Sequence, residues 1–201
     1  MVNNIYIKKS IIKISEEKYL EIIEDYSITN GLYKLGGANG SGKSIFLEYV
    51  SGLKKNDNII KKIKHNKILF LGESGIGLEE LTVFENIKLV YWIFGAQFNE
   101  IVMEKVKMLY TKEQLNTIYS QASFGMQLMV GLSLLFSEIE WELIILDEVL
   151  NGLDKDNRLL ILANVQKKSN NSIVFLVSHG EIDNTNEYKE VEIIDKKIIF
   201  K

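Results

Sequence analysis

A glycine-rich segment limits most strongly how this chain can fold. Residues 37–44 read Gly-Ala-Asn-Gly-Ser-Gly-Lys-Ser, with four residues between the first glycine and the Gly-Lys-Ser ending. This is the spacing of a phosphate-binding loop, which joins a strand to the N-terminus of a helix. A short apolar strand at residues 32–35 precedes the loop, and residues 43–53 predict a helix closed by Gly52. Because strand, loop and helix occur in the required order, a plain glycine-rich turn is the weaker interpretation.

The loop residues have the chemistry that binding a triphosphate needs. Glycines allow backbone N–H groups to turn inward around an anion, and the following helix directs its positive N-terminus at the same point. Lys43 would neutralise the β- and γ-phosphate oxygens, and the Ser44 hydroxyl can bind Mg²⁺. The residues predicted to contact the nucleotide here are Gly37, Asn39, Gly40, Ser41, Gly42, Lys43 and Ser44.

A pair of carboxylates follows a second apolar strand. Residues 143–146 are Leu-Ile-Ile-Leu, and Asp147 and Glu148 come directly after them. Asp147 is placed to bind the metal or its water shell, and Glu148 to polarise an attacking water. Acidic residues also end buried strands as simple solvated caps, so the pair indicates a nucleotide site only in combination with the upstream loop.

The order of segments predicts an α/β fold with a mostly parallel central sheet. Residues 5–14 and 19–28 alternate in the β manner and predict an N-terminal antiparallel β subdomain. Residues 78–136 predict a helical subdomain, in which Thr82 and Glu85 have the spacing of a capping box. A helix at 159–168, a strand at 173–177 and a β pair at 191–200 follow, and we expect one domain over residues 1–201.

Composition excludes several classes of protein. The chain has 201 residues, a formal charge of −3 and no cysteine, which excludes disulfides, thiolate metal sites and a catalytic thiol. The acidic balance argues against nucleic acid as a partner, and the lysine-rich stretch 54–67 is better explained as a solvated edge hairpin. No secretory signal opens the sequence, and no apolar run approaches the ~20 residues of a membrane-spanning helix. We therefore expect a cytoplasmic chain.

With these motifs in order, the chain resembles the ATP-binding cassette (ABC) family, the ATPase subunits of ABC transporters, over nearly its whole length. Residues 123–127, Ser-Phe-Gly-Met-Gln, are similar to the family's signature motif, in which Ser123 and Gly125 would contact the γ-phosphate held by the opposite protomer. Ala122 replaces the usual leucine, and Met129 stands where an arginine is often found. A serine that caps an apolar helix is the alternative explanation of this segment.

Other positions follow from the same resemblance. Residues 151–154 are similar to the D-loop and place Asp154 at the dimer contact, although Val-Leu replaces Pro-Thr before it and a plain turn explains Asn-Gly equally well. His179 matches the switch histidine that bridges γ-phosphate, water and Glu148, and Glu73 stands at the place of the Q-loop glutamine, where it could reach Mg²⁺. Tyr19 is the nearest candidate for stacking on adenine, and it is also suited to packing in the sheet.

The resemblance implies a subunit that binds and hydrolyses ATP with Mg²⁺ and powers an ABC transporter. It implies an ATP-sandwich dimer with a second copy or a homologue, and an integral-membrane subunit that holds the chain at the inner face of the membrane. Residues 85–98 resemble the segment on which that subunit docks, while their aromatic residues are equally suited to filling a core. Residues 79–86 and the Gly-Met pair look most like exporters of peptides, antibiotics or bacteriocins.

Two alternative functions stay open at this point. A soluble cassette ATPase of a nucleic-acid or ribosomal assembly would need a basic face, for which only residues 54–67 offer lysines. A small P-loop kinase or GTPase would not require Ser123, Asp154 and His179 in this order, and no Asn-Lys-x-Asp guanine-reading motif occurs. Phosphate transfer to an acceptor other than water would favour the kinase.

Overall fold

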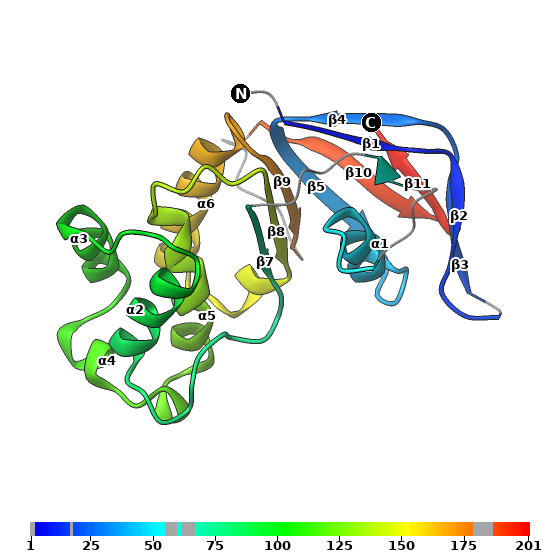
Figure 1. Ribbon diagram of the computed structural model, residues 1–201. Helices are drawn as coiled ribbons and strands as arrows, with labels where there is room; N and C mark the ends of the chain where they lie inside the picture. Colours follow the sequence, from blue (N-terminus) through cyan, green and yellow to red (C-terminus); the bar gives the residue numbers. More distant parts are fainter. Residues whose placement is uncertain (1–2, 17, 55–59, 62–66, 179–186) are drawn as a thin grey trace. The chain divides into compact units, whose positions relative to one another are not determined.

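The computed structural model describes residues 3–16, 18–54, 60–61, 67–178 and 187–201 (Figure 1). The chain divides into two compact units. The first contains residues 1–70, 140–148 and 166–201, and the second contains residues 71–139 and 149–165. Each unit is described by itself below.

The first unit is built around β-sheet. The strands of the chain are β1 (Asn4–Ile7), β2 (Ser10–Lys13), β3 (Tyr19–Ile22), β4 (Tyr26–Thr29), β5 (Gly31–Gly37), β6 (Ile60–Lys61), β7 (Ile68–Leu71), β8 (Leu143–Asp147), β9 (Ile173–Val177), β10 (Lys189–Ile194) and β11 (Lys197–Phe200). Eight form one sheet in the order β2-β3-β11-β10-β5-β9-β8-β7, and β4-β1-β6 form a second, antiparallel sheet. Within the large sheet β10, β5, β9 and β8 run parallel. The predicted α/β class, with a mostly parallel sheet and antiparallel N-terminal strands, is confirmed.

The N-terminal residues form four strands where the alternation predicted two. β1 pairs with β4 and β2 pairs with β3, so one long hairpin bends and sends its two halves into different sheets. Asp25 stabilises the bend, because its carboxylate accepts hydrogen bonds from the Lys9 amide and the Tyr6 hydroxyl. Alternation alone cannot reveal such a bend, since both halves keep a period of two.

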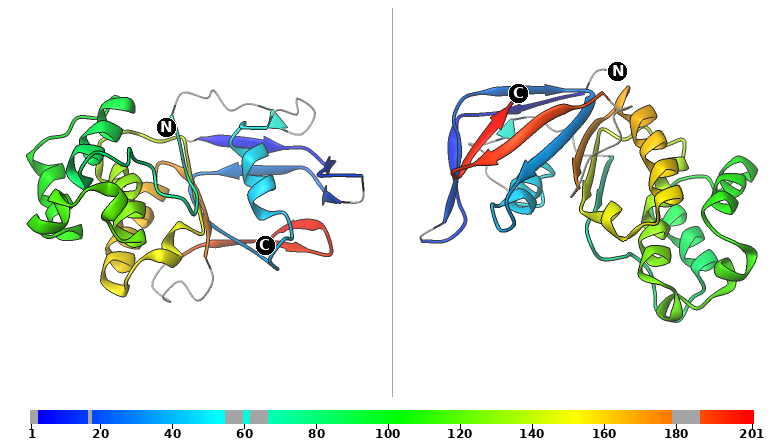
Figure 2. Two further views of the ribbon diagram at one scale, coloured as in Figure 1. Left: turned by 90° about the horizontal axis from the view of Figure 1, so that it is seen from below. Right: turned by 180° about the vertical axis from the view of Figure 1, so that it is seen from behind.

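Helix α1 (Lys43–Val50) follows the glycine-rich loop and lies beside β5 (Figure 2). It ends three residues before the predicted boundary, and Gly52 follows it in the left-handed conformation with φ of 77°. Phe46, Leu47 and Val50 are buried in the core of the unit. The ring of Phe46 meets Phe175 of β9 edge-on at 6.1 Å, which fixes the helix against the centre of the sheet.

The second unit is largely helical. Its elements are α2 (Val83–Ile93), α3 (Glu100–Leu109), α4 (Lys112–Asn116), the 3₁₀ turn η1 (Tyr119–Gln121), α5 (Phe124–Leu132), the 3₁₀ turns η2 (Ser133–Phe136) and η3 (Val149–Gly152), and most of α6 (Lys155–Ser169). The capping box predicted at the start of α2 is confirmed: Thr82 accepts from the Glu85 amide and Glu85 accepts from the Thr82 amide. Helix α6 begins four residues before the predicted start.

The aromatic residues between 85 and 98 differ in their exposure. Tyr91 is buried, donates a hydrogen bond to the Ser133 carbonyl at 2.6 Å and meets Phe98 edge-on at 5.2 Å. Trp92, in contrast, is 78% exposed, and Phe94 is also exposed. Tyr91 therefore fills the core of this unit, while Trp92 is available to a partner.

Two sequence expectations fall partly outside the described residues. Of the lysine-rich stretch 54–67, the structure places β6 against β1 in an antiparallel pair, and residues 55–59 and 62–66 lie outside the described part. Among the described helices, none combines the length and the apolar character that crossing a membrane would require.

Candidate active site

The predicted site residues of the first unit gather at one edge of the large sheet. β5, β9 and β8 are parallel neighbours in that order, so their carboxyl ends lie together (Figure 1). β5 ends at Gly37 and β8 ends at Asp147. Open α/β sheets bind ligands at such an edge, outside the carboxyl ends of their strands. The glycine loop and the Asp-Glu pair thus come from the same edge of the sheet, with β9 between their strands.

Two of the loop positions admit only glycine. Gly37 has φ of 143°, and a Cβ there would lie 2.8 Å from Ser41 Oγ and 3.1 Å from the Ile193 carbonyl oxygen. Gly42, at the N-cap of α1, has φ of 104°, and a Cβ there would lie 2.9 Å from Leu20 Cδ1. Both positive φ angles and both close approaches exclude larger residues. The loop can take this shape because its glycines have no side chains.

The Lys43 side chain bridges two carbonyl groups of the loop. Its Nζ donates hydrogen bonds to the carbonyl oxygens of Gly37 at 3.0 Å and Ala38 at 3.2 Å, and the side chain is only 7% exposed. Residues 37–40 are exposed, and the first turn of α1 contains no acidic residue. A buried ammonium and a free helix N-terminus therefore face the same loop, which favours an anion there.

Asp147 lies against this loop. The Ser44 side chain and the Lys43 ammonium lie close enough to its carboxylate to lower its pKa. Burial nevertheless raises the pKa of Asp147 above its ordinary value, an effect that the Ser44 side chain opposes and the Glu148 charge reinforces. Its Oδ1 atom is buried without a hydrogen-bond partner in the described part of the chain. The carboxylate thus keeps one acceptor oxygen for a further ligand.

Glu148 adopts a backbone conformation that is unusual for its residue type. Its φ is 60°, and its amide donates to the Val177 carbonyl oxygen at 3.0 Å, which fixes it beside the end of β9. A left-handed conformation costs a residue with a side chain roughly 1–2 kcal/mol. Such strain gathers at functional sites, where the surrounding structure maintains it.

Glu48 is a further charged group near the site that we did not predict from the sequence. It lies on α1 and its charge raises the pKa of Asp147. Its carboxylate pairs with Lys54 Nζ at 2.6 Å. The spacing of four residues after Ser44 was the available signal, because residues four apart share one face of a helix.

The chain is similar in sequence to a known protein family. The family model described as "ABC transporter" matches residues 29–151, which is more than half of the chain. The chain belongs to the ABC transporter family. It is 32% identical to the cytochrome c biogenesis ATP-binding export protein CcmA of Rickettsia bellii, over 87% of this chain and 91% of that protein. As a member of this family it is an ATP-binding and ATP-hydrolysing subunit.

Solved structures show the same fold. A putative ABC transporter ATP-binding protein from Pyrococcus furiosus superposes with a TM-score of 0.75 at 22% identity, over 94% of this chain and 97% of that one. A dimeric ATP-binding cassette in a post-hydrolysis state, bound to ADP and Pi, superposes with a TM-score of 0.71 at 21% identity, over 96% of each chain. The P-loop NTPase fold expected from the glycine loop is therefore confirmed for this ABC ATPase.

The predicted signature residues belong to the second unit. Ser123 is the N-cap of α5, and its hydroxyl accepts from the Met126 amide at 3.3 Å. Gly125 packs against η3, because a Cβ there would lie 2.7 Å from the Gly152 carbonyl oxygen. Ser123 therefore caps α5, as the helix-capping interpretation predicted. Because Ser123 is also exposed, the same residue can have a second role.

Asp154 and Glu73 are also in the second unit. Asp154 precedes α6, and its carboxylate accepts from the Asn157 amide at 2.9 Å and from Asn157 Nδ2 at 2.8 Å. These hydrogen bonds hold the pKa of Asp154 below its ordinary value. Glu73 is exposed. His179 lies outside the described residues, and Ser178 before it is the last described residue of this segment.

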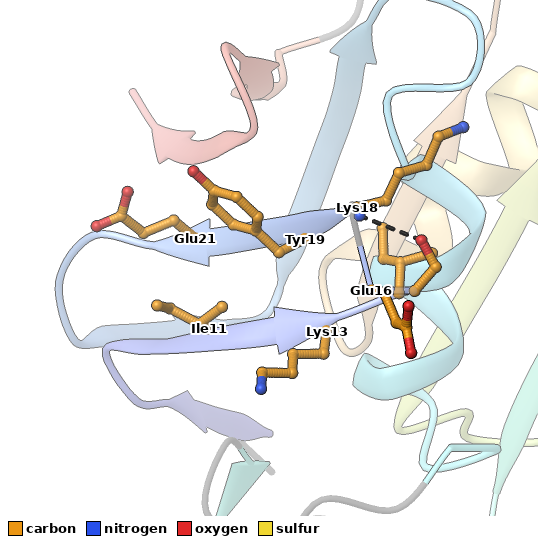
Figure 3. Close-up of a pocket in the computed structure, with 8 residues that line it drawn as sticks. Ile11, Lys13, Glu16, Lys18, Tyr19 and Glu21 are labelled. Carbon is orange, nitrogen blue, oxygen red and sulfur yellow. Dashed lines mark hydrogen bonds between the residues drawn. The ribbon is translucent and has the colours of Figure 1, made fainter.

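Tyr19 is not placed for stacking beside the phosphate loop. Leu20 is the β3 residue that meets Gly42, and successive residues of a strand point to opposite faces, so Tyr19 faces away from the loop. Its ring lies under Lys196 Nζ at 4.7 Å. It lines an open groove of about 680 Å³ on the β2–β3 hairpin (Figure 3). The other residues lining this groove are Ile11, Lys13, Ile14, Ser15, Glu16, Lys18 and Glu21.

Proposed function

We propose that this chain is the ATP-hydrolysing subunit of an ABC exporter and works with Mg²⁺ at the edge formed by the glycine loop and Asp147. The proximity of the Ser44 side chain to the Asp147 carboxylate, beside the loop whose carbonyl groups Lys43 contacts, carries the proposal. It joins the two motifs that must act on one nucleotide.

The residues present fit magnesium. Mg²⁺ prefers oxygen ligands, usually one or two from protein together with phosphate oxygens and waters. Ser44 supplies a hydroxyl, and the buried Oδ1 of Asp147 supplies an acceptor without a partner among the described residues. When bound, the metal would neutralise charge on the β- and γ-phosphates. Ser44 and Asp147 would hold it, and Glu73 is proposed to reach it or one of its waters.

The chain's own groups account for the remaining requirements of hydrolysis. The amides of Gly40, Ser41 and Gly42 and the Lys43 ammonium would bind the phosphates, with Gly37 and Asn39 shaping the loop. When phosphate oxygens enter, they would replace the two carbonyl oxygens that Lys43 contacts. Glu148, fixed beside the end of β9, would orient and deprotonate the attacking water. His179 is proposed to contact the γ-phosphate and that water.

A second ATPase subunit would complete each site. In the proposed sandwich Ser123 and Gly125 of one copy contact the γ-phosphate bound by the other, and Asp154 contributes to the contact between copies. The dimeric ATP-binding cassette with the same fold supports this arrangement. The second subunit is either another copy of this chain or a homologue.

Work on a substrate would take place in a separate integral-membrane subunit, which holds this chain at the cytoplasmic face of the membrane. The exposed Trp92 offers that subunit a contact. Relatives named ATP-binding export proteins favour export as the direction. We propose a peptide, antibiotic or bacteriocin as cargo from the pattern of residues 79–86 and the Gly125-Met126 pair, with the cargo of the cytochrome c biogenesis relatives as the competing candidate.

Two measurements test the proposal. Purified chain should release phosphate from ATP in the presence of Mg²⁺, and Lys43→Ala should lower ATP affinity by at least about tenfold, or 1.4 kcal/mol. Unchanged titration of Lys43→Ala with ATP would remove the phosphate loop from its role. Transport is tested by co-purifying the chain with a multi-spanning membrane protein encoded by a neighbouring gene. Stimulation of ATP hydrolysis by that protein is expected, and salt-sensitive RNA or DNA binding instead would favour a nucleic-acid assembly.

A further inference from the structure

The loop that follows β7 is packed against Tyr119 in the second unit. A Cβ at Gly75 would clash with the Tyr119 hydroxyl, and it would lie 3.0 Å from the Gln127 backbone carbon. A Cβ at Gly77 would lie 2.7 Å from Cε2 and Cζ of the same ring and 3.0 Å from Asn86 Oδ1. The ring of Tyr119 therefore lies directly against Gly77, and its hydroxyl lies against Gly75. Gly72, on the same loop, has no heavy atom within 4 Å of its Cβ position.

Shape rather than hydrogen bonding holds Tyr119 in this place. Its side chain is 6% exposed, and its hydroxyl is buried with no hydrogen-bond partner among the described residues. A buried hydroxyl without a partner disfavours folding, because it loses its hydrogen bonds to water, so the contact depends on the fit of the side chain against the two glycines. This is an unusual use of tyrosine, because buried tyrosine hydroxyls are normally paired.

Tyr119 is also joined to helix α5, which begins with the signature segment. Its carbonyl oxygen accepts from Gln127 Nε2 at 2.8 Å, and Gln127 is the same residue whose backbone lies against Gly75. The Tyr119 amide donates to the Leu81 carbonyl at 2.8 Å, and Thr82 forms a β-bridge with Ile118. Tyr119 is therefore held to the loop on one side and to α5 on the other.

We infer that Tyr119 is a positioning residue that makes the Glu73 loop and the start of α5 move as one body. The inference rests on the proposed function, in which Glu73 serves the nucleotide of its own copy and Ser123 serves the nucleotide of the other copy. Because the Glu73 loop and the start of α5 are rigidly linked, nucleotide bound by one copy changes the position of Ser123 at the nucleotide of the other copy. The two sites of the dimer then hydrolyse ATP cooperatively, with a Hill coefficient above one and no greater than the number of sites.

Paired glycine variants test the link. Gly75→Ala places a methyl group against Tyr119 and should lower the Hill coefficient for ATP hydrolysis to about one. ATP affinity should stay within about twofold, because the phosphate loop belongs to the first unit. Gly72→Ala makes the same chemical change on the same loop in open space and should keep the cooperativity. Circular dichroism and thermal unfolding show whether each variant folds.

Substitution of the tyrosine separates shape from hydrogen bonding. Tyr119→Phe keeps the ring and should keep the cooperativity, whereas Tyr119→Ala should lose it. Because the hydroxyl is the atom nearest to a Cβ at Gly75, adding Tyr119→Phe to Gly75→Ala should restore part of the lost cooperativity. A purely structural contact would change thermal stability in the same series and leave the Hill coefficient unchanged.

The outcomes distinguish this inference from the proposed function. Wild-type chain that hydrolyses ATP with a Hill coefficient of one overturns the link and leaves the function standing. Gly75→Ala with undiminished cooperativity also overturns the link, as does equal loss in Gly72→Ala. Wild-type chain that neither binds nor hydrolyses ATP overturns the proposed function itself.

Discussion

The Ser44 side chain, in the first turn of α1, lies close enough to the carboxylate of Asp147 at the end of β8 to lower the pKa of that carboxyl. Ser44 belongs to the glycine loop and Asp147 to the Asp-Glu pair, the two motifs that the sequence analysis assigns to one nucleotide site. Their proximity means that the helix N-terminus and the acidic strand end act on the same small volume. It also leaves the buried Oδ1 atom of Asp147 as the acceptor to which a metal or its water can add.

Asp147→Asn is predicted to stabilise the nucleotide-free chain at neutral pH. Burial raises the pKa of Asp147 in the folded state, so the stability associated with this carboxyl is complete below its unfolded pKa of about 3.9 and is lost as the pH rises through the raised value. The ionised carboxylate therefore disfavours folding at pH 7. Thermal unfolding should show a higher Tm for the variant at pH 7 and a smaller difference near pH 4.

The same variant should lose stabilisation by MgATP. A ligand at 100 times its Kd stabilises the folded state by about 2.7 kcal/mol, which wild-type chain should show as a rise in Tm with added MgATP. Asp147→Asn should show little of that rise, because it lacks the charge proposed to hold the metal. An equal MgATP-dependent shift in both proteins would contradict the role given to Asp147.

Neighbouring glycines allow a matched test of the loop. Gly37→Ala should weaken ATP binding by at least about tenfold, because its φ is 143° and its Cβ would meet Ser41 Oγ at 2.8 Å. Gly36→Ala introduces the same group at ordinary contact distance, 3.5 Å from Glu192 Cγ, and should bind ATP normally. Titration calorimetry on both variants decides the point. Equal affinities would show that the loop geometry does not set nucleotide binding.

Asp154 combines a structural role with a proposed role at the dimer contact, and two substitutions separate them. Asp154→Ala removes the acceptor for the Asn157 amide and should destabilise the chain by ~1 kcal/mol in denaturant unfolding. Asp154→Asn keeps a capping acceptor and removes the charge, so it should unfold like wild type. If Asp154 contributes to the dimer contact, Asp154→Asn should still lower ATP hydrolysis, whereas wild-type activity would restrict Asp154 to helix capping.

The core of the site was predictable from the sequence because its signals are local. The loop from Gly37 to Ser44 needs a strand before it and a helix after it, and both can be read within a few residues. The strand that ends at Asp147 is uniformly apolar, as expected for a strand buried on both faces of a parallel sheet. The order of motifs along the chain then identified the family.

Features that depend on tertiary contacts were not predictable. The bend that divides β1 from β2 leaves the alternation unchanged. The left-handed conformation of Glu148 is imposed by its contact with Val177, since nothing in the residue type favours it. The close approach of Gly75 and Gly77 to Tyr119 has no local signal, because it joins segments that are distant in the sequence.

ATP affinity and turnover, measured together for wild type and Glu148→Gln, test the central claim most directly. Because Glu148 is proposed to activate water and not to bind phosphate, the variant should bind ATP like wild type and turn it over about 10²–10⁴-fold more slowly. It should also form an ATP-dependent dimer in size-exclusion chromatography. Normal hydrolysis by Glu148→Gln would contradict the assignment of this edge of the sheet as the catalytic site.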